Sequence, residues 1–293
     1  MNHLDNHNIL SPNQFGFRKK HSTYMPLLIL QNRILDGFEQ GKIGCTIYLD
    51  LKKAFDTVDH RILLHKLQLY GINGVFLAII ASYLSNRYQC VEYMNVKSGL
   101  QKITMGVPQG SILGPLLFLL YINDFPKIST KFESFLYADD TALFFKADST
   151  NELQKMLDEE LPKVHKWLQT NKLTLNIDKT VYQIYNKSKT EEHVQVNLAG
   201  SLIQQTNVVK YLGIMVEENM KWEAHVMHIS RIISRNIGII NRSKHFLNKE
   251  YLQLLYNAMV LPYINYCCLL WGTSSKSALH RLTILQKKNN TNN

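Results

Sequence analysis

Hydrophobic and polar positions along the chain predict a mixed body of strands and helices, followed by a wholly helical C-terminal part. Leu, Ile and Phe recur at helical spacing over residues 24–40, and an apolar run over residues 44–51 predicts a strand. Two further helices are predicted over residues 58–70 and 74–86, with Gly71 and Gly74 marking the turn between them. The first third of the chain is therefore predicted as helix, strand, helix, helix.

A hairpin, a glycine-rich loop and a second hairpin are predicted next. Short alternating segments at residues 87–93 and 99–105 predict strands that pair across residues 95–98. Residues 106–116 contain three glycines and two prolines and lead into an apolar helix that ends near Phe125. Residues 135–145 predict a buried hairpin with its turn at residues 138–140.

The pattern then changes from mixed to helical. Residues 151–171 carry Leu, Met and Trp on one helical face, after an N-cap at Ser149 or Thr150. Strands are predicted over residues 173–185, 194–198 and 208–216, and Gly213 in the last of them indicates a bulge or a close backbone approach. Helical spacing continues to the end, with a break near Pro262, over residues 222–242, 249–260, 263–271 and 277–288.

Composition narrows the class of protein. At 293 residues and 45% hydrophobic, the chain is long enough for a sizeable core and more than one subdomain, which excludes a disordered chain. Its 33 Lys and Arg against 23 Asp and Glu give a net charge of +10, which favours polyanionic partners such as nucleic acid.

The cysteines and the apolar runs narrow the cellular compartment that the sequence predicts. The four cysteines form no Cys-x-x-Cys pair, which argues against a zinc module or a disulfide framework and for a reducing intracellular setting. The apolar runs are too short to span a bilayer, and the first residues do not follow the pattern of a signal peptide. We therefore expect a soluble protein without a membrane partner.

Two adjacent carboxylates interrupt the most apolar hairpin. Asp139 and Asp140 stand between aromatic and aliphatic residues, where water is scarce and like charges repel unless a cation lies beside them. A solvated turn is the simpler explanation of an Asp-Asp pair. However, the predicted strand 44–51 also brings a carboxylate, Asp50, to its end. Two such strand ends predict a hard-cation site for Mg²⁺, an arrangement typical of nucleotidyl transfer.

Two loops offer further polar groups, each with an ordinary structural explanation. Gln109 and Ser111 are the groups that the glycine-rich loop presents to a ligand, although a plain strand-to-helix connection has the same composition. The basic cluster at residues 18–20, just before the first helix, suits a phosphate group and equally suits a solvated turn that initiates the helix.

The order of these motifs resembles the reverse transcriptase domain of non-LTR retrotransposons, the LINE-like and jockey-like elements. The resemblance covers nearly the whole chain from about Leu10. It pairs six stretches with the family's motifs: residues 14–23 with the last fingers motif, 50–60 with motif A, 106–118 with motif B, 137–140 (Tyr-Ala-Asp-Asp) with motif C, 167–180 with motif D, and 210–213 with the start of the primer grip.

This resemblance implies an α+β, right-hand polymerase fold with an antiparallel palm sheet packed on helices. It implies partial fingers at residues 1–43, a palm at residues 44–220 and a helical thumb at residues 221–293. Within the palm section it implies fingers-side helices and a hairpin at about residues 61–105, and a primer-grip strand at about residues 208–220.

The resemblance also implies roles for individual residues. Asp50 and Asp139 are expected to bridge two Mg²⁺ ions, with Mn²⁺ as an alternative, while Asp140 completes the carboxylate cluster and the Leu51 carbonyl is a further metal ligand. Phe55 matches the steric gate that favours dNTP over NTP, although core packing is its ordinary role. The other implied nucleotide contacts are Gln109, Arg18 (with Lys19 or Lys20) and Lys179, and the implied primer or template contacts are Tyr137, Gly110, Lys210, Tyr211, Leu212 and Gly213.

The implied reaction extends a primer 3′-hydroxyl with dNTPs on an RNA template, so the expected partners are RNA template, DNA primer or target DNA, and dNTP, in the cytoplasm and nucleus. Asp56 and Asp59 are interpreted as local hydrogen-bonding or N-capping groups. Upstream fingers and endonuclease segments are expected in the full element protein, and without the upstream fingers we expect weak or no activity. Two alternatives stay open: a relic that acts only as a nucleic-acid-binding module, and an RNA-dependent RNA polymerase, against which Phe55 and Tyr-Ala-Asp-Asp argue.

Overall fold

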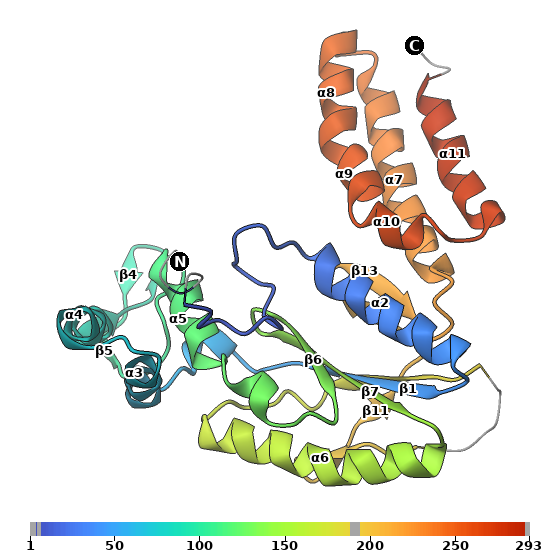
Figure 1. Ribbon diagram of the computed structural model, residues 1–293. Helices are drawn as coiled ribbons and strands as arrows, with labels where there is room; N and C mark the ends of the chain where they lie inside the picture. The colour runs from blue at the N-terminus through green and yellow to red at the C-terminus, as the bar shows by residue number, and fades with distance from the viewer. Residues whose placement is uncertain (1–3, 5–6, 188–193, 291–293) are drawn as a thin grey trace.

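The computed structural model describes residue 4 and residues 7–187 and 194–290, which form a mixed strand-and-helix body with a group of helices rising from one end (Figure 1). The body contains, in chain order, α2 (Tyr24–Glu39), β1 (Ile43–Leu49), η1 (Ala54–Asp56), α3 (His60–Leu69), α4 (Gly74–Leu84), β2 (Arg87–Gln89), β3 (Glu92–Tyr93), β4 (Val96–Lys97), β5 (Gln101–Ile103), α5 (Leu113–Tyr121), η2 (Phe125–Lys127), β6 (Glu133–Tyr137), β7 (Asp140–Ala147), α6 (Thr150–Thr170) and β8 (Val181–Tyr185).

The rest of the chain adds short strands and then helices. The strands are β9 (Asn197–Leu198), β10 (Ser201–Leu202), β11 (Gln204–Gln205), β12 (Val208–Tyr211) and β13 (Ile214–Glu217). The C-terminal helices are α7 (Glu223–Ser243), α8 (Lys249–Met259), α9 (Leu261–Asn265), α10 (Cys268–Trp271) and α11 (Lys276–Asn290).

The central sheet has five strands in the order β11-β8-β1-β7-β6. Strand β1 pairs antiparallel with both β7 and β8, and β6 pairs antiparallel with β7. Only the short edge strand β11 runs parallel to its neighbour β8 among the described strands of this sheet. The predicted α+β class with an antiparallel sheet packed on helices is therefore confirmed.

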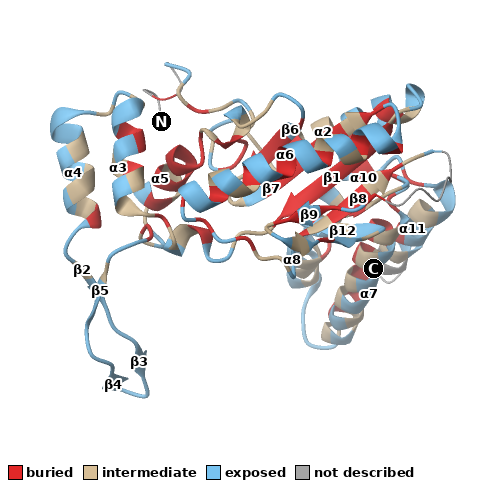
Figure 2. Ribbon diagram, turned by 90° about the horizontal axis from the view of Figure 1, so that it is seen from below, coloured by how far each residue is buried: buried red, intermediate tan, exposed pale blue. Residues whose placement is uncertain are grey.

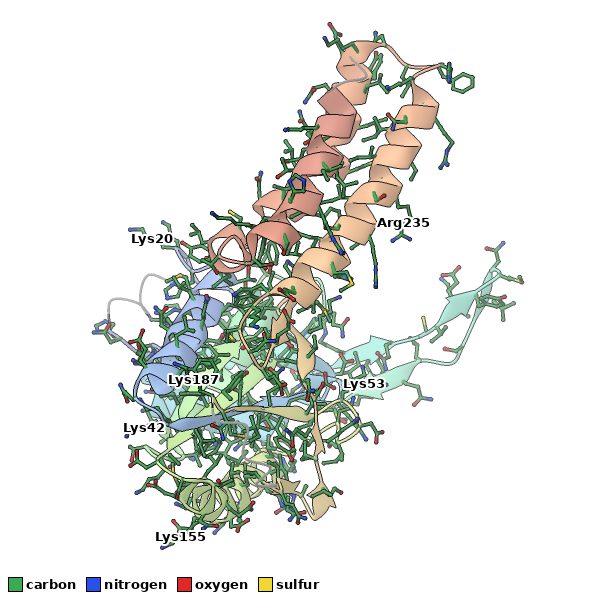
Figure 3. All side chains as sticks on the ribbon, turned by 90° about the vertical axis from the view of Figure 1, so that its right-hand side faces the viewer. Lys20, Lys42, Lys53, Lys155, Lys187 and Arg235 are labelled. Carbon is green, nitrogen blue, oxygen red and sulfur yellow. The ribbon has the colours of Figure 1, made fainter. Side chains whose placement is uncertain are left out.

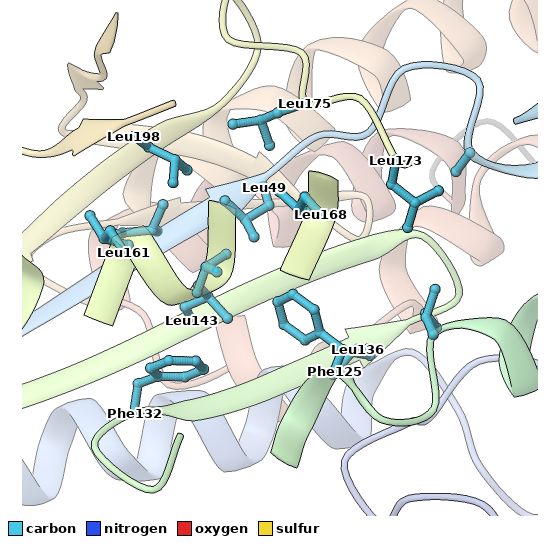
Figure 4. Packing of buried hydrophobic residues seen from close by; sticks show 14 of the residues in the cluster. Leu49, Phe125, Phe132, Leu136, Leu143, Leu161, Leu168, Leu173, Leu175 and Leu198 are labelled. Atoms are coloured by element: carbon cyan, nitrogen blue, oxygen red, sulfur yellow. The ribbon is translucent and has the colours of Figure 1, made fainter. Parts of the chain in front are cut away.

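Both faces of the sheet are covered, which explains why β1 is an unbroken buried run and does not alternate with polar residues. Side chains alternate along each strand. Ile47 and Leu143 belong to the apolar cluster formed with α6, whereas Tyr48 and Phe144 belong to the cluster formed with α2 and α7. Figure 1 shows α2 on one side of the sheet and α6 on the other, and Figure 4 shows the packing on the α6 side, where Leu161 and Leu168 meet Leu49 and Leu143.

Helices α3 and α4 and the strands β2 to β5 form an arm beside the sheet (Figure 2). The strands form two small ladders, β2 with β5 and β3 with β4, and the turn between β3 and β4 has positive φ at Met94 and Asn95. The predicted hairpin is present, but its turn is at residues 94–95 and not across residues 95–98, so β4 lies inside the predicted loop. Much of the arm is exposed, including apolar residues such as Phe76 and Met94.

The C-terminal helices pack on one another through a stripe of isoleucines on α7 at helical spacing: Ile229, Ile233, Ile237 and Ile240. Trp271 on α10 and Leu282 on α11 are buried in the same cluster. Figure 3 shows α7 and its neighbours rising from the body, with Arg235 projecting on the side where the arm also extends. No helix in the described part of the chain has both the length and the apolar character needed to cross a membrane.

Two strand predictions are corrected by the structure. Residues 208–216 form a hairpin, not one bulged strand, because Leu212 and Gly213 both adopt positive φ, +45° and +80°, and turn the chain back on itself. The predicted strand 173–185 begins only at Val181, since residues 176–180 form a turn in which the Thr180 N–H bonds to the Asn176 carbonyl. Of the predicted strand 194–198, only Asn197–Leu198 is a strand.

The helix predictions were closer to the structure. Ser149 is the N-cap of α6, and its hydroxyl accepts a hydrogen bond from the Glu152 N–H. The predicted helix 263–271 is divided into α9 and α10 by Tyr266 and Cys267, and Pro262 lies in the first turn of α9, where its missing N–H costs nothing.

Candidate active site

The pairing register of the sheet brings the predicted carboxylates to one place. Leu49 on β1 is paired with Thr141 on β7, so the next position places Asp50 opposite Asp140. Asp139 lies in the two-residue turn between β6 and β7, next to Asp140. Because side chains alternate, Asp50 and Asp140 share the face of Tyr48 and Ala142, which is the face covered by α2 and α7.

The electrostatics show that these negative charges are close and uncompensated. Burial raises the pKa of Asp139, and the charge of Asp50 raises it further. Although Asp140 is partly open to solvent, burial by the surrounding protein, with the charges of Asp139 and Asp50, raises its pKa to about 6. Asp139 and Asp140 are therefore harder to ionise than isolated carboxylates, which is the condition that a bound cation relieves.

Asp50 is held in position by the turn that precedes β8. The Asn176 side-chain amide donates to Asp50 Oδ2 over 2.7 Å, and the Asn176 backbone N–H donates to the Asp50 carbonyl over 2.8 Å. The Asp50 N–H donates to Thr180 Oγ1 over 3.3 Å. Both partners come from the segment that was predicted as the start of a strand, and no local pattern in that segment indicated them.

The turn that carries Asp139 is fixed by the N-terminal segment. Gln14 is buried, and its Oε1 accepts hydrogen bonds from the Ala138 N–H over 3.0 Å and from the Gly16 N–H over 2.8 Å. Ala138 has φ +57°, a left-handed conformation that costs energy for a residue with a side chain. The buried amide thus stabilises a strained turn, a role that the motif's sequence did not reveal.

Backbone contact between this segment and the turn is very close at Gly16. A β-carbon placed on Gly16 would lie 2.3 Å from the Ala138 nitrogen and 2.9 Å from the Tyr137 carbonyl carbon. The Phe15 N–H also donates to the Leu136 carbonyl, and the Leu136 N–H donates to the Asn13 carbonyl. Residues 13–16 therefore extend the sheet beyond β6. Position 16 lies so close to the turn of residues 137–140 that only glycine fits there.

The glycine-rich loop lies against the chain that follows β1. The Val107 N–H donates to the Phe55 carbonyl over 2.8 Å, and a β-carbon on Gly106 would lie 2.7 Å from the Asp56 carbonyl oxygen. The side-chain amide of Gln109 donates to Asp56 Oδ1 over 2.7 Å. Asp56 is thus a hydrogen-bonding group, but its partner is the distant Gln109 and not the neighbouring helix, whose N-cap is Asp59.

Phe55 and Asp59 occupy defined positions around this loop. The Phe55 ring stacks on the Phe118 ring with centroids 4.4 Å apart, and it is half-buried, so one part of the ring remains accessible. Asp59 caps α3, since its carboxylate accepts hydrogen bonds from the Arg61 and Ile62 N–H groups. The interpretation of Asp59 as an N-capping group is borne out by these contacts.

The hairpin of β12 and β13 lies beside the carboxylates. The Tyr211 ring contacts the Tyr48 ring with centroids 5.0 Å apart, and its hydroxyl donates to the Phe135 carbonyl over 3.3 Å. Burial, with a smaller contribution from the charge of Asp140, raises the pKa of Tyr211. Lys210 and Gly213 of the same hairpin are exposed, and Tyr137 is half-buried at the end of β6.

Other predicted residues lie in less specific surroundings. The Arg18 guanidinium donates to the Ser11 and Gln14 carbonyl oxygens over 2.9 and 3.2 Å, so it closes the loop of residues 11–18. Lys179 is exposed in the turn before β8. Leu51 lies one residue beyond Asp50 and bridges to Leu175. Gly110 has φ +75° in the exposed part of the glycine-rich loop.

The residues present fit a divalent cation that is completed by other ligands. Within the described ranges, no three His, Cys, Asp or Glu side chains are grouped closely enough to hold a metal ion alone. Mg²⁺ is usually bound through one or two carboxylates together with waters and substrate phosphates, not by an all-protein cage. Asp139 and Asp140, whose pKa values are raised, together with Asp50 at the end of β1, match that requirement.

Comparisons with a family model and with known sequences point to the same family. The family model described as reverse transcriptase (RNA-dependent DNA polymerase) matches residues 1–216. A probable RNA-directed DNA polymerase from transposon BS of Drosophila melanogaster is 29% identical over 292 residues, which are 96% of this chain and 32% of that protein. The RNA-directed DNA polymerase from mobile element jockey of the same species is 29% identical over 94% of this chain and 31% of its own length. The chain thus spans about a third of the length of these relatives.

Solved structures share the fold at low sequence identity. Apo telomerase from Candida tropicalis matches 98% of this chain and 57% of its own chain, with a TM-score of 0.51 and 12% identity. A form of that enzyme truncated from its C-terminal domain matches 74% of this chain and 41% of its own, with a TM-score of 0.51 and 13% identity. The predicted right-hand polymerase fold is confirmed by this likeness, and so is the predicted resemblance to jockey-like elements by the sequence relatives. The chain belongs to the reverse transcriptase (RNA-dependent DNA polymerase) family.

Proposed function

We propose that this chain is the polymerising part of a non-LTR retrotransposon protein and that it extends a primer 3′-hydroxyl with dNTPs on an RNA template. The observation that carries the proposal is the meeting of Asp50, Asp139 and Asp140 at one edge of the central sheet, with raised pKa at two of them, beside the β12–β13 hairpin. The relatives' names describe RNA-directed DNA polymerases, which is the same chemistry.

Asp50, Asp139 and Asp140, with the Leu51 carbonyl, are proposed to hold two Mg²⁺ ions, with Mn²⁺ as an alternative. When bound, such ions activate the attacking hydroxyl and neutralise the triphosphate. The chain's own part is to keep its oxygen ligands in register: Asn176 fixes Asp50, and Gln14 fixes the turn of Asp139. Fixed ligands keep the primer 3′-hydroxyl and the α-phosphate of the dNTP aligned. Such alignment accounts for much of the rate enhancement in phosphoryl transfer.

The nucleotide is proposed to bind between the glycine-rich loop and residues 50–56. Gln109, held by Asp56, is positioned to hydrogen-bond the sugar or base, and Phe55 is positioned to exclude a ribose 2′-hydroxyl. Arg18, with Lys19 or Lys20, is proposed to contact the triphosphate, and Lys179 the leaving pyrophosphate. Because Arg18 already bonds two carbonyl groups, the exposed Lys19 and Lys20 are the stronger members of that basic cluster.

The primer end is proposed to lie over the turn of the β12–β13 hairpin. Lys210, Tyr211, Leu212 and Gly213 then act as the primer grip, with Tyr137 and Gly110 close to the primer and template strands. Above them, Arg231, Arg235 and Arg281 line a groove of about 650 Å³ between α7 and α11. Three arginines in one groove suit the phosphate backbone of a template–primer duplex, and binding there is expected to weaken as salt rises.

The wider setting follows from the same proposal. Upstream fingers and endonuclease segments are proposed to belong to the fuller element protein, as the partial coverage of the relatives suggests. Action on target DNA places the protein in the nucleus after synthesis in the cytoplasm.

The direct test is primer extension on a poly(rA)/oligo(dT) template with dTTP and Mg²⁺. We expect weak extension by this chain and stronger extension by a version that carries an upstream fingers segment. Both should disappear when EDTA replaces Mg²⁺, because the reaction needs cations at the carboxylates. Binding of the template–primer without extension, by this chain and by a version that carries an upstream fingers segment, would instead support a nucleic-acid-binding module. Absence of both binding and extension would contradict the proposal altogether.

Phe55 provides a test of sugar selection. Changing Phe55→Val is expected to raise rNTP incorporation relative to dNTP by roughly tenfold, because loss of a steric exclusion of this size is worth about 1–3 kcal/mol. The measurement is the ratio of kcat/KM for UTP and dTTP. Phe246→Val, at a residue of the C-terminal helical part that is 87% exposed, is the matched control and should leave the ratio unchanged. An unchanged ratio in Phe55→Val would leave the ring with a packing role against Phe118 alone.

A further inference from the structure

A single tyrosine outside all the motifs connects three parts of the molecule. Tyr266 lies in the connection between α9 and α10, at the base of the C-terminal helices. Its hydroxyl oxygen is 2.7 Å from the Leu212 carbonyl oxygen and 3.0 Å from Thr23 Oγ1. Leu212 is in the turn of the β12–β13 hairpin, and Thr23 is the residue before α2. Figure 1 shows α9 and α10 above α2 and β13, where these contacts are made.

The direction of the two hydrogen bonds follows from their chemistry. A tyrosine hydroxyl has one hydrogen and also accepts, whereas a carbonyl only accepts. The Tyr266 hydroxyl must therefore donate to Leu212, and the Thr23 hydroxyl then donates to Tyr266. The Thr23 side chain makes no capping hydrogen bond to α2, and it shares its hydrogen-bonding surroundings with Tyr266 and the Cys267 thiol. The result is a pair of linked hydrogen bonds that runs from Thr23, just before α2, through Tyr266 to the β12–β13 turn.

The ring of Tyr266 also restricts the turn sterically. A β-carbon on Gly213 would lie 3.3 Å from Tyr266 Cε1, so the ring packs directly on the glycine backbone. The backbone of Tyr266 is itself fixed, because its carbonyl accepts a hydrogen bond of 2.8 Å from Nε1 of the buried Trp271. A cavity of about 450 Å³ lies beside the turn and is lined by residues of the hairpin, α7 and α9, among them Lys210, Gly213, His228, Tyr263 and Tyr266.

The rest of the hairpin needs such a restraint. A two-stranded hairpin is marginally stable by itself. Its strands are anchored below by Tyr211, which bonds to the Phe135 carbonyl, and by the Val216 carbonyl, which accepts from the buried Gln183 amide over 3.1 Å. Strand β13 is also held to α7, because the Met215 N–H donates to His225 Nδ1 over 3.4 Å and the Ala224 N–H donates to Glu217 Oε2 over 3.0 Å. Tyr266 adds a restraint at the turn itself, through Leu212 and Gly213.

We propose that Tyr266 is a positioning residue for the primer end: its hydroxyl and ring hold the Leu212–Gly213 turn at a fixed distance from the carboxylates and couple that turn to the C-terminal helices and to α2. This inference rests on the proposed function, since it assigns to Tyr266 the placement of the primer that the hairpin grips. The expected consequence is selective, because the hydrogen bonds of the Tyr266 hydroxyl in the described part of the chain go to Leu212 and Thr23, and neither belongs to the proposed nucleotide site.

The test compares Tyr266→Phe, which keeps the ring and removes the hydroxyl, with Tyr263→Phe. Tyr263 is a tyrosine of α9 with the same exposure, 38%, that lines the same cavity. We expect Tyr266→Phe to raise the Kd for a recessed RNA/DNA template–primer, measured by fluorescence anisotropy, by about fivefold, the effect of one net hydrogen bond. The KM for dTTP should change less than about twofold, and Tyr263→Phe should match the wild type. Thr23→Val is expected to raise the same Kd by a smaller factor, about twofold.

Several outcomes would overturn the inference. An unchanged primer Kd in Tyr266→Phe would do so, as would an equal rise of the Kd for a blunt RNA/DNA duplex of the same length, or a parallel rise in the KM for dTTP. If Tyr266→Phe fails to fold, Thr23→Val decides, and an unchanged Kd in that variant contradicts the proposed chain of contacts. A wild-type protein that binds the recessed substrate without extending it would contradict the proposed function, while the ratio of affinities would still decide the role of Tyr266.

Discussion

Changing Asp139 and Asp140 together to asparagine is expected to lower Mg²⁺-dependent DNA synthesis by about 10³-fold or more. The expected loss follows from the cations that these carboxylates are proposed to hold, which contribute several kcal/mol of charge stabilisation; about 4 kcal/mol corresponds to ~10³ in rate. The measurement is the initial rate of primer extension at saturating dTTP. Asn keeps the size of each side chain, so the turn and its contacts with Gln14 should survive.

The control for this experiment is Asp178→Asn, an exposed carboxylate in the turn before β8, which should retain the wild-type rate. Synthesis by the double variant at the wild-type rate, still dependent on Mg²⁺, would show that the metal ions are held elsewhere.

The same double variant should be at least as stable as the wild type without metal. The folded-state pKa of Asp140 is about 6, above its ordinary value of 3.8, so the folded state binds more protons than the unfolded state between these values. The contribution of Asp140 to stability is therefore present below about pH 4 and is lost as the pH rises to about 6. In EDTA, the Tm of the variant minus that of the wild type should grow over this interval and then level off. A difference that shrinks as the pH rises would contradict the like-charge cluster.

The second large effect is expected at Gly16. Changing Gly16→Ala is expected to lower the free energy of unfolding by about 2–3 kcal/mol, because a new β-carbon 2.3 Å from the Ala138 nitrogen forces backbone to move. The segment that moves is the turn that carries Asp139. A displacement of about 1 Å at a reacting centre costs on the order of 10²-fold in rate, so primer extension should fall with stability. Urea unfolding and primer extension measure the two effects.

Gly99→Ala is the matched control, because a β-carbon at Gly99 meets no atom within 4 Å and its φ is not in the left-handed region. It should be neutral in both measurements. Full stability and full activity of Gly16→Ala would show that the N-terminal segment is not held against the catalytic turn as the structure has it.

The sequence predicted helices and strands best where the hydrophobic positions followed a single spacing, either that of a helix or that of a strand. Strand β1 and helix α6 have strong patterns and clear ends, and both were found where predicted, with Ser149 as the N-cap. The pattern failed at residues 208–216, because alternation is the same in one strand and in a hairpin, and Gly213 was consistent with either. The positive φ of both Leu212 and Gly213 distinguishes the turn, and the Leu212 carbonyl accepts a hydrogen bond from Tyr266, a residue 54 positions away.

The candidate site also contains residues that the sequence could identify and residues that it could not. Asp50, Asp139 and Asp140 were identifiable because carboxylates at the ends of apolar strands are costly without a partner. Asn176, Gln14 and Asp56 were not identifiable as supporting residues, because each acts through a partner more than 40 positions away in the chain. Such contacts leave no periodic signal. The carboxylates proposed to bind metal could therefore be brought together as a hypothesis from the sequence, whereas the residues that orient them required the fold.

The segment at residues 13–16 has a consequence that goes beyond the site. An unprotected outer strand of a sheet offers a row of free N–H and C=O groups on which another molecule can add, leading to aggregation. Here the outer strand β6 is occupied at Leu136 by Asn13 and Phe15, while the opposite outer strand, β11, is only two residues long. Residues 13–16, which contact the turn of Asp139, thus also cover the outer strand β6. Substitutions that detach them are expected to promote self-assembly as well as loss of activity.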